Sequence, residues 1–212
     1  MSTTERRVRQ KAETRQRILD AARLIARDKD WNAVTIRSIA DAIEYTAPIV
    51  YEHFENKEDV LHSIVRQGHE EIKAAFDSVL AQPMDANEKL VQLSMVQWNF
   101  ATSQPEVFRL MHNPERMAQQ REQMRDEMHE ARCRMNSLFS ELGVREQLVP
   151  EAIFNWFCLI TGYINLITNV KPDEAERHLK ALNDPAMAAL FKDTTSLYER
   201  AIRRFLHNLS SL

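Results

Sequence analysis

The chain has 212 residues, which is enough for one or two compact domains with a buried core. With 44% hydrophobic residues but only 3 glycines and 7 prolines, the composition excludes a disordered chain and a β-rich fold built on many turns. Two cysteines, Cys133 and Cys158, form no C-x-x-C pair, which argues against a disulfide scaffold and a zinc site. The first 17 residues are polar and basic, without a secretion signal, so we expect a cytoplasmic protein.

The net charge of −3 is unevenly distributed. Residues 1–27 hold eight Arg or Lys and three acidic residues, a charge of +5, which leaves −8 on the remainder. A basic start on an acidic body is suited to contact a polyanion at one end. A solvated, frayed N-terminus would have the same composition, so both interpretations stay open.

Hydrophobic periodicity predicts four helices at the start of the chain. The first covers about residues 11–28, and its apolar face consists of Ile18, Leu19, Ala22, Ile25 and Ala26. The second is predicted over Thr35–Ile43, with its first residue as the N-cap, and the third over Ala47–Phe54. The fourth follows Asn56, its predicted N-cap, and ends before Pro83.

Longer helices separated by proline and glycine follow. Apolar stripes predict helices over residues 90–101, 105–111, 117–142, 153–168 and 186–209. Gly143 is expected to end the 117–142 helix as the residue after its C-cap. Because no strand-type alternation of useful length occurs, the predicted fold class is all-α, with about nine helices.

The first three helices are predicted to form a helix-turn-helix head. About three residues join the second helix to the third, so the third can enter the major groove of DNA while the second braces it. Pro48 is compatible with this, because Thr46 as N-cap places the proline in the first turn, where a backbone N–H has no intrahelical acceptor. We therefore predict a DNA-binding domain over residues 1–60 and a second domain over residues 61–212.

Lys57 lies at the N-terminal end of the fourth predicted helix. Glu58 and Asp59 suit the helix dipole there, whereas a lysine does not. A DNA phosphate could compensate the lysine and also accept hydrogen bonds from the free N–H groups of the helix. A solvated surface lysine is the alternative.

Three segments together resemble the DNA-binding domain of the TetR family of bacterial transcriptional regulators: TRQRILDAA (14–22), TIRSIADA (35–42) and VYEHFENKEDVL (50–61). The resemblance covers about 48 residues with its internal spacings intact. It implies that the third helix is the recognition helix. It also implies phosphate contacts from Tyr51, His53 and Lys57, with Phe54 packed beneath the head.

The same resemblance implies further DNA-contacting positions. Positions 46, 47 and 49 would face base edges, and Arg37 with Thr35 would approach the backbone or groove from the second helix. The predicted DNA-binding set is Thr35, Arg37, Tyr45, Thr46, Ala47, Ile49, Tyr51, His53 and Lys57. Residues 47–49 offer methyl and methylene groups rather than hydrogen bonds, so we expect phosphate contacts and DNA shape to supply much of the affinity.

Three positions depart from the usual pattern of the family. Glu44, after the second helix, and Asp30, after the first, stand where glycine is usual, and Pro48 replaces a small polar residue or glycine. Glu44 must take a positive φ, or the turn must differ, and its carboxylate adds negative charge near the DNA. The fine geometry of base reading depends on these three residues.

Methionine and aromatic residues on the later helices predict a mostly apolar pocket for a hydrophobic or aromatic small molecule. These helices line ligand cavities in the family that the chain resembles. The predicted ligand-binding set is Met95, Trp98, Phe108, Met111, His112, Met117, Met124, Met128, Phe154, Phe157 and Thr161. For any single methionine, filling a gap in the core is the alternative.

The segment 153–167 is too short for a membrane span and is apolar nearly all round, so it must be covered on all sides. One face could lie in the core or pocket and the other against a partner subunit, or the whole helix could be central to one core. The resemblance implies a homodimer formed by the helices Ile153–Thr168 and Ala186–Leu209 of both subunits. Two heads on one twofold axis suit a palindromic operator.

These observations predict a ligand-responsive transcriptional regulator, most simply a repressor that a hydrophobic or aromatic effector releases from double-stranded DNA. The alternative is a helical small-molecule-binding or oligomerisation protein without specific DNA binding, which Glu44 would favour. Because the sequence lacks a nucleophile motif, a phosphate-binding glycine loop and an H-E-x-x-H motif, we predict no enzyme activity, no cofactor and no metal.

Overall fold

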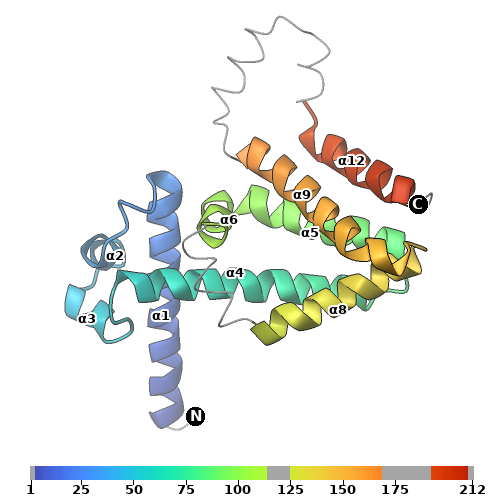
Figure 1. The fold of residues 1–212 in the computed structure, drawn as a ribbon. Helices are drawn as coiled ribbons and strands as arrows, with labels where there is room; N and C mark the ends of the chain where they lie inside the picture. The colour runs from blue at the N-terminus through green and yellow to red at the C-terminus, as the bar shows by residue number, and fades with distance from the viewer. Residues whose placement is uncertain (1–2, 114–124, 169–191, 210–212) are drawn as a thin grey trace, which may run out of the picture. The chain divides into compact units, whose positions relative to one another are not determined.

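The computed structural model describes residues 3–113, 125–168 and 192–209, with residues 3 and 125–128 described by their backbone alone. All regular structure in these ranges is helical: nine α-helices and one short 3-10 helix (Figure 1). The predicted all-α fold class is therefore confirmed. No helix in the described ranges has both the length and the apolar character needed to cross a membrane.

The chain divides into two compact units. The first unit consists of residues 1–71 and 104–116, and the second of residues 72–103 and 117–212. The helix α4 (Lys57–Leu80) therefore belongs partly to each unit. The first unit also extends beyond the predicted head, residues 1–60, and includes a helix from later in the chain. The division into a DNA-binding and a ligand-binding domain stays a prediction.

The helix α1 (Thr3–Asp28) begins eight residues before the predicted start at residue 11. Its first turns have no apolar face, and residues 4–13 are all exposed. They are rich in good helix formers, and a 2.8 Å ion pair between Arg9 and Glu13, four residues apart, supports the helix. Periodicity could not reveal this extension, because a fully exposed helix has no buried stripe.

The helix α2 (Ile36–Ala42) begins at the predicted N-cap, Thr35. The Thr35 hydroxyl accepts a 3.0 Å hydrogen bond from the Ser38 amide, and the Ser38 hydroxyl accepts one of 2.9 Å from the Thr35 amide. This reciprocal capping box satisfies two amides that would otherwise lack partners.

Glu44 takes a positive φ of 60° in the turn after α2, the only non-glycine residue in the described ranges to do so. The amide of Tyr45 donates to the carbonyl of Ala40 at 2.9 Å, and that of Glu44 to Asp41 at 3.3 Å. These bonds form a Schellman motif, in which the residue after the C-cap must be left-handed. Of the two outcomes predicted for Glu44, the positive φ is the one observed.

The helix α3 (Ala47–Tyr51) has Thr46 as its N-cap and a proline in its first turn, as predicted, although the threonine side chain makes no capping hydrogen bond. The prediction that it continues to residue 54 is wrong. The chain leaves the helix after Tyr51, and Phe54 turns inward to become 2% exposed, with the Arg15 guanidinium carbon 4.5 Å from its ring centre. The burial of Phe54 confirms the predicted packing beneath the head.

The core of the first unit draws on all four of its N-terminal helices. The fourth helix starts as predicted, because the Asn56 side chain accepts a 3.0 Å hydrogen bond from the Asp59 amide. The side chains at the centre of this core, none more than 2% exposed, are Ile18, Leu19, Ala22, Val34, Ile39, Val50, Phe54, Val60 and Ile64. This burial fixes the short α3 to the longer helices beneath it.

The second unit is built mainly from four helices, α5 (Ala86–Ser103), α8 (Arg125–Glu141), α9 (Val149–Thr168) and α12 (Thr194–Leu209), with the short 3-10 helix η1 (Glu146–Leu148) preceding α9. The first, third and fourth of these lie side by side in Figure 1. The stripe predicted for α5, which consists of Leu90, Val91, Ser94, Trp98 and Ala101, forms part of its buried face.

Ser94 joins three of these helices. Its hydroxyl accepts a 3.1 Å hydrogen bond from the Trp156 indole, and its carbonyl accepts one of 2.9 Å from the Tyr198 hydroxyl. Tyr198 also stacks on Trp98, with ring centres 4.6 Å apart. Since all four groups are buried, the network satisfies polar atoms that could not reach water.

Gly143 ends α8 as predicted. It has a φ of 84°, its amide donates to Ser140 at 2.9 Å, and the amide of Val144 donates to Phe139 at 3.3 Å. This is the same Schellman arrangement as that after α2, here with glycine at the left-handed position.

Candidate nucleic-acid interface

The recognition helix predicted from the sequence, α3, is anchored by one residue and otherwise open. Val50 is fully buried, whereas Thr46 is exposed and Ala47 and Ile49 are half-buried. Tyr51 is 57% exposed. The residues predicted to face base edges are thus accessible, and their contact with DNA stays a prediction.

Arg17 braces the turn that precedes α3. Its guanidinium donates to the carbonyl of Ile43 at 3.1 Å and to the Tyr45 hydroxyl at 3.3 Å, and its central carbon lies 5.1 Å from the centre of the Tyr45 ring. One side chain of α1 therefore holds both the end of α2 and the left-handed turn. No sequence pattern indicates this role, because the partners lie 26 and 28 residues away.

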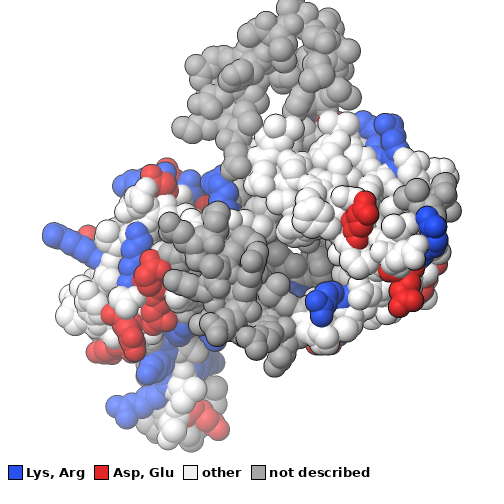
Figure 2. Space-filling view, viewed as in Figure 1, with Lys and Arg blue, Asp and Glu red and all other residues white. Residues whose placement is uncertain are grey.

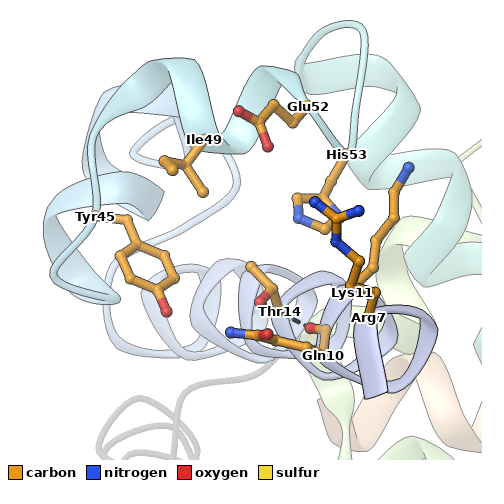
Figure 3. Close-up of a pocket in the computed structure, with 8 residues that line it drawn as sticks. All are labelled: Arg7, Gln10, Lys11, Thr14, Tyr45, Ile49, Glu52 and His53. Carbon is orange, nitrogen blue, oxygen red and sulfur yellow. Dashed lines mark hydrogen bonds between the residues drawn. The ribbon is translucent and has the colours of Figure 1, made fainter. Parts of the chain in front are cut away.

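A groove of about 500 Å³ separates the first turns of α1 from α3 (Figure 3). Its lining residues are Arg7, Gln10, Lys11, Thr14, Tyr45, Ile49, Glu52 and His53. Tyr45, Ile49 and His53 belong to the predicted DNA-binding set, so the structure brings three of those residues together. The four residues from α1 were not predicted, although their spacing of three, one and three places them on one helix face.

His53 is the titratable group of this groove with a displaced pKa. Desolvation lowers its pKa below the ordinary 6.5, and the positive charges of Lys11 and Arg15 lower it further, while Glu52 acts in the opposite direction. Its Nδ1 atom is buried without a hydrogen-bond partner in the described part of the chain. The imidazole therefore favours the neutral form until an anion enters the groove.

Lys57 is half-buried and does not line the groove. Its ammonium donates a 2.7 Å hydrogen bond to the carbonyl of Trp31. The argument that a lysine at this helix end needs an outside anion is therefore wrong, since a carbonyl of the same unit compensates it. A phosphate contact by Lys57 remains a prediction that its two other N–H donors allow.

The two predicted residues near α2 are also outside the groove. The Thr35 hydroxyl is engaged in the capping box, and Arg37 is exposed. Asp30, which stands where the family has glycine, needs no positive φ. Its carboxylate accepts hydrogen bonds from the amides of Asn32 at 2.6 Å and Ala33 at 3.1 Å and so closes the loop after α1.

The predicted ligand-binding residues do not all lie in the interior. Phe154 is 64% and Phe157 41% exposed, away from the packed residues of α9, and their contact with a ligand stays a prediction. Thr161 uses its hydroxyl to donate to the carbonyl of Phe157 at 2.7 Å. The opposite side of α9 is packed through Trp156, Ile160 and Ile164, which explains why the phenylalanines face outward.

The other members of the predicted ligand-binding set divide between the two units. Met95 and Trp98 belong to the second unit, whereas Phe108, Met111 and His112 belong to the first. Trp98, Phe108 and Met111 are buried, and Met95 and His112 are half-buried. Met117 and Met124, and the side chain of Met128, lie outside the described residues.

His112 ends the short helix α6 (Pro105–Met111). Its ring stacks on Phe108 with ring centres 4.0 Å apart, and its Nδ1 lies 2.9 Å from the carbonyl oxygen of Phe108. Burial lowers the pKa of His112, against the effect of the carbonyl, and His69 lowers it further. The described contacts therefore give this histidine a structural role in α6.

The described residues contain no group of three His, Cys, Asp or Glu side chains that could hold a metal ion. Separately, the groove presents the cationic groups of Arg7 and Lys11, the hydroxyl of Thr14 and the imidazole of His53. These groups suit recognition of an anion.

Comparison with known proteins places these features in context. Residues 18–64 match the family described as bacterial regulatory proteins, tetR family. No curated protein matches the sequence. The matched segment includes α2, α3 and the start of α4, so it covers the exposed helix and one wall of the groove.

Solved structures are similar over almost the whole chain. A protein of unknown function from Rhodococcus sp. RHA1 is 15% identical, with a TM-score of 0.67, and the match covers 92% of this chain and 95% of that one. A transcriptional regulator of the TetR/AcrR family from Thermobifida fusca is 22% identical, with a TM-score of 0.59 and coverage of 93% and 97%. The TetR family regulator PfmR from Thermus thermophilus is 16% identical, with a TM-score of 0.62 and coverage of 92% and 97%. At these identities the likeness concerns the fold.

Proposed function

Because the chain belongs, through its residues 18–64, to the tetR family of bacterial regulatory proteins, which are DNA-binding transcriptional regulators, we propose that it is a ligand-responsive repressor of a palindromic operator. The observation that carries the proposal is the presentation of α3. A buried valine and a braced turn hold this helix, while its remaining side chains stay accessible beside a groove with two cationic residues. A rigid, exposed short helix of this kind is suited to the major groove.

The DNA contacts we propose combine base-edge and phosphate interactions. Thr46, Ala47 and Ile49 face the bases, and Tyr51 and His53 contact phosphates. The apolar character of Ala47 and Ile49 suits the methyl group of thymine better than hydrogen-bonded base readout. Much of the affinity then comes from phosphates and DNA shape.

Dimerisation through α9 and α12 would place two heads on one twofold axis. Support comes from three large apolar side chains of α9, Phe154, Phe157 and Leu166, which are 64%, 41% and 55% exposed. Three large apolar side chains on one helix are costly to leave in water. Exposed apolar side chains of this kind are what a subunit interface requires.

We further propose that the second unit binds a hydrophobic or aromatic effector near Met95 and Trp98 and thereby shifts the protein toward a state that does not span two half-sites. Thermal unfolding with a panel of aromatic and aliphatic compounds tests this, because a ligand of the folded state raises the midpoint. A compound that raises the midpoint must also lower DNA affinity. Stabilisation without loss of DNA binding would contradict effector control.

The central experiment is a DNA-binding titration by fluorescence anisotropy. The probe is double-stranded DNA that flanks the protein's own gene, and the competitor is a shuffled duplex of equal length and composition. We expect binding to the flanking DNA at least about 1000-fold tighter than to the shuffled duplex. Equal affinity for both would favour the alternative function, a helical binding or oligomerisation protein without specific DNA recognition, for which the exposed Glu44 is the structural argument.

A further inference from the structure

The basic residues of α1 fall into two groups according to their partners. Five arginines have partners within the first unit: Arg9 pairs with Glu13, Arg15 donates to Ser63, Arg17 to the carbonyl of Ile43, Arg23 to Gln67, and Arg27 pairs with Asp28. Arg6, Arg7 and Lys11 make no ion pair or side-chain hydrogen bond with any other described residue. The unpaired cations are thus concentrated in the first turns, where Figure 2 shows Lys and Arg side chains gathered at the foot of the view.

Two of these unpaired cations face the groove. Arg7 and Lys11 are four residues apart and share one side of α1 with Gln10 and Thr14, opposite His53 (Figure 3). Arg9, which lies between them in sequence, is not part of the lining and is neutralised by its ion pair. Of the unpaired cations, Arg7 and Lys11 line the groove and Arg6 does not.

The positive charges in the groove also oppose each other. Burial chiefly lowers the pKa of His53, and the positive charge of Lys11 lowers it further. The single carboxylate of the lining, Glu52, acts in the opposite direction and is exposed to solvent. An anion placed among Arg7, Lys11 and His53 would relieve this repulsion and give all three a charged partner. An open groove beside an exposed helix is accessible to an extended polyanion as well as to a small anion.

We propose that this groove holds a stretch of DNA sugar–phosphate backbone, with Arg7 and Lys11 as its phosphate ligands. This inference rests on the proposed function, which it deepens by extending the DNA-binding surface beyond α3 to the first turns of α1. The backbone of a strand whose bases meet Ile49 would run along the open side of the same groove. The contact fixes the register of α3 on the duplex but carries no sequence information.

A pair of charge-matched double variants tests the proposal. Arg7→Gln/Lys11→Gln removes the two groove cations, and Arg9→Gln/Arg27→Gln removes two cations of the same helix that are already paired. Affinity for the flanking duplex is measured at several salt concentrations. Each lost phosphate contact lowers the slope of log affinity against log salt by about 0.9, and a dimer on a palindromic operator loses two contacts per subunit. We therefore expect the first variant to lose about 3.6 units of slope and the control to keep the wild-type slope.

The expected loss has a second signature. The first variant should bind the flanking and shuffled duplexes more weakly by the same factor, at least about tenfold at low salt, because phosphates are common to both. A wild-type slope in the first variant, or an equal loss of slope in the control, would overturn the inference while leaving the proposed function intact. Absence of DNA binding by the wild-type chain overturns both.

A further experiment distinguishes binding of the DNA backbone from binding of free anions. Isothermal titration of the wild-type protein with inorganic phosphate should show no saturable binding below about 1 mM, since a single small anion gains only a fraction of the contacts. Tight binding of free phosphate that the first variant abolishes, together with unchanged DNA affinity, would make the groove a small-anion site and overturn the proposal. Circular dichroism of both variants checks that α1 stays helical.

Discussion

The ammonium of Lys57 donates a 2.7 Å hydrogen bond to the carbonyl of Trp31, and the indole of Trp31 donates one of 3.0 Å to the carbonyl of Glu106. The start of α4, the loop after α1 and the start of α6 are thus connected inside the first unit. Lys57 stabilises this unit in the absence of DNA, whatever it contacts in the complex.

Lys57→Met should therefore lower the free energy of unfolding. The substitution keeps the length of the side chain but removes a charge-assisted hydrogen bond, so we expect a loss of about 1–2 kcal/mol in urea unfolding without DNA. Lys29→Met, at an exposed position after α1, is the control and should change stability by less than about 0.5 kcal/mol. Equal stability of the Lys57 variant and wild type would mean that the bond to Trp31 contributes nothing.

Glu44→Gly should stabilise the protein. A left-handed residue other than glycine costs about 1–2 kcal/mol, and glycine loses part of this gain through its greater freedom in the unfolded chain. We expect a net gain of about 0.5–1 kcal/mol in thermal or urea unfolding. Gly143→Ala, in the same motif after α8, has no neighbouring atom within 4 Å of the added carbon, so the strain of φ alone should cost it about 1 kcal/mol.

Charge and strain at Glu44 can be separated. Glu44→Gln keeps the side chain at φ 60° but removes its negative charge, so stability should stay unchanged while DNA affinity rises about two- to tenfold at low salt. If Glu44→Gln changes neither quantity and Glu44→Gly changes both, then backbone strain, not charge, limits DNA binding.

DNA affinity should increase as the pH falls, because of His53. In the free protein, the pKa of His53 lies below 6.5 because burial lowers it and the charges of Lys11 and Arg15 lower it further, while Glu52 opposes them. A bound phosphate would raise this pKa. The complex then binds more protons than the free protein, so affinity rises from about pH 8 toward about pH 6. His53→Gln should flatten the dependence, whereas His62→Gln, at an exposed position on α4, should not. An unchanged pH profile in the His53 variant would remove the histidine from the phosphate site.

Protein stability should fall on acidification, because of His112. Its pKa is lowered in the folded state, chiefly by burial, so the folded protein binds fewer protons than the unfolded chain. The stabilisation is fully present above about pH 6.5, the unfolded value, and is lost as the pH falls toward the folded pKa. Urea unfolding between about pH 7.5 and pH 5 should show a smaller decline for His112→Gln than for wild type. An identical decline would exclude a contribution from this ring.

Ser94→Ala should weaken the second unit. It removes the acceptor of the buried Trp156 indole, and a buried donor left without a partner costs about 1–3 kcal/mol. Ser103→Ala, at the end of the same helix and exposed, removes a hydroxyl that donates to the carbonyl of Asn99 at 2.7 Å and should cost much less. Urea unfolding followed by tryptophan fluorescence compares the two variants. Equal losses would mean that burial of the network around Ser94 adds nothing to its stabilising effect.

Local features were readable from the sequence. The N-cap Thr35, the Asn56 cap of α4 and the glycine after α8 were all predicted, because each involves residues at most five apart in the chain. The reciprocal bond from Ser38 at the first of these caps was not predicted. The apolar pattern likewise predicted a helix for every described α-helix, by an apolar stripe in most segments and by a continuous apolar run in α9. The boundaries were less well predicted: α1, α5 and α9 begin earlier than expected, and α3 ends earlier.

Contacts between distant segments could be settled only by the tertiary structure. Sequence patterns could not show that Lys57 meets a carbonyl 26 residues away or that α6 joins the first unit. Nor could they show which side of α9 faces outward, because a helix apolar nearly all round has no polar face to mark it. The sequence by itself thus determined the helices, their caps and the family of the head. Tertiary packing decided which charges stay unpaired and converge on the groove, because a charge is paired or free only through partners that the fold brings to it.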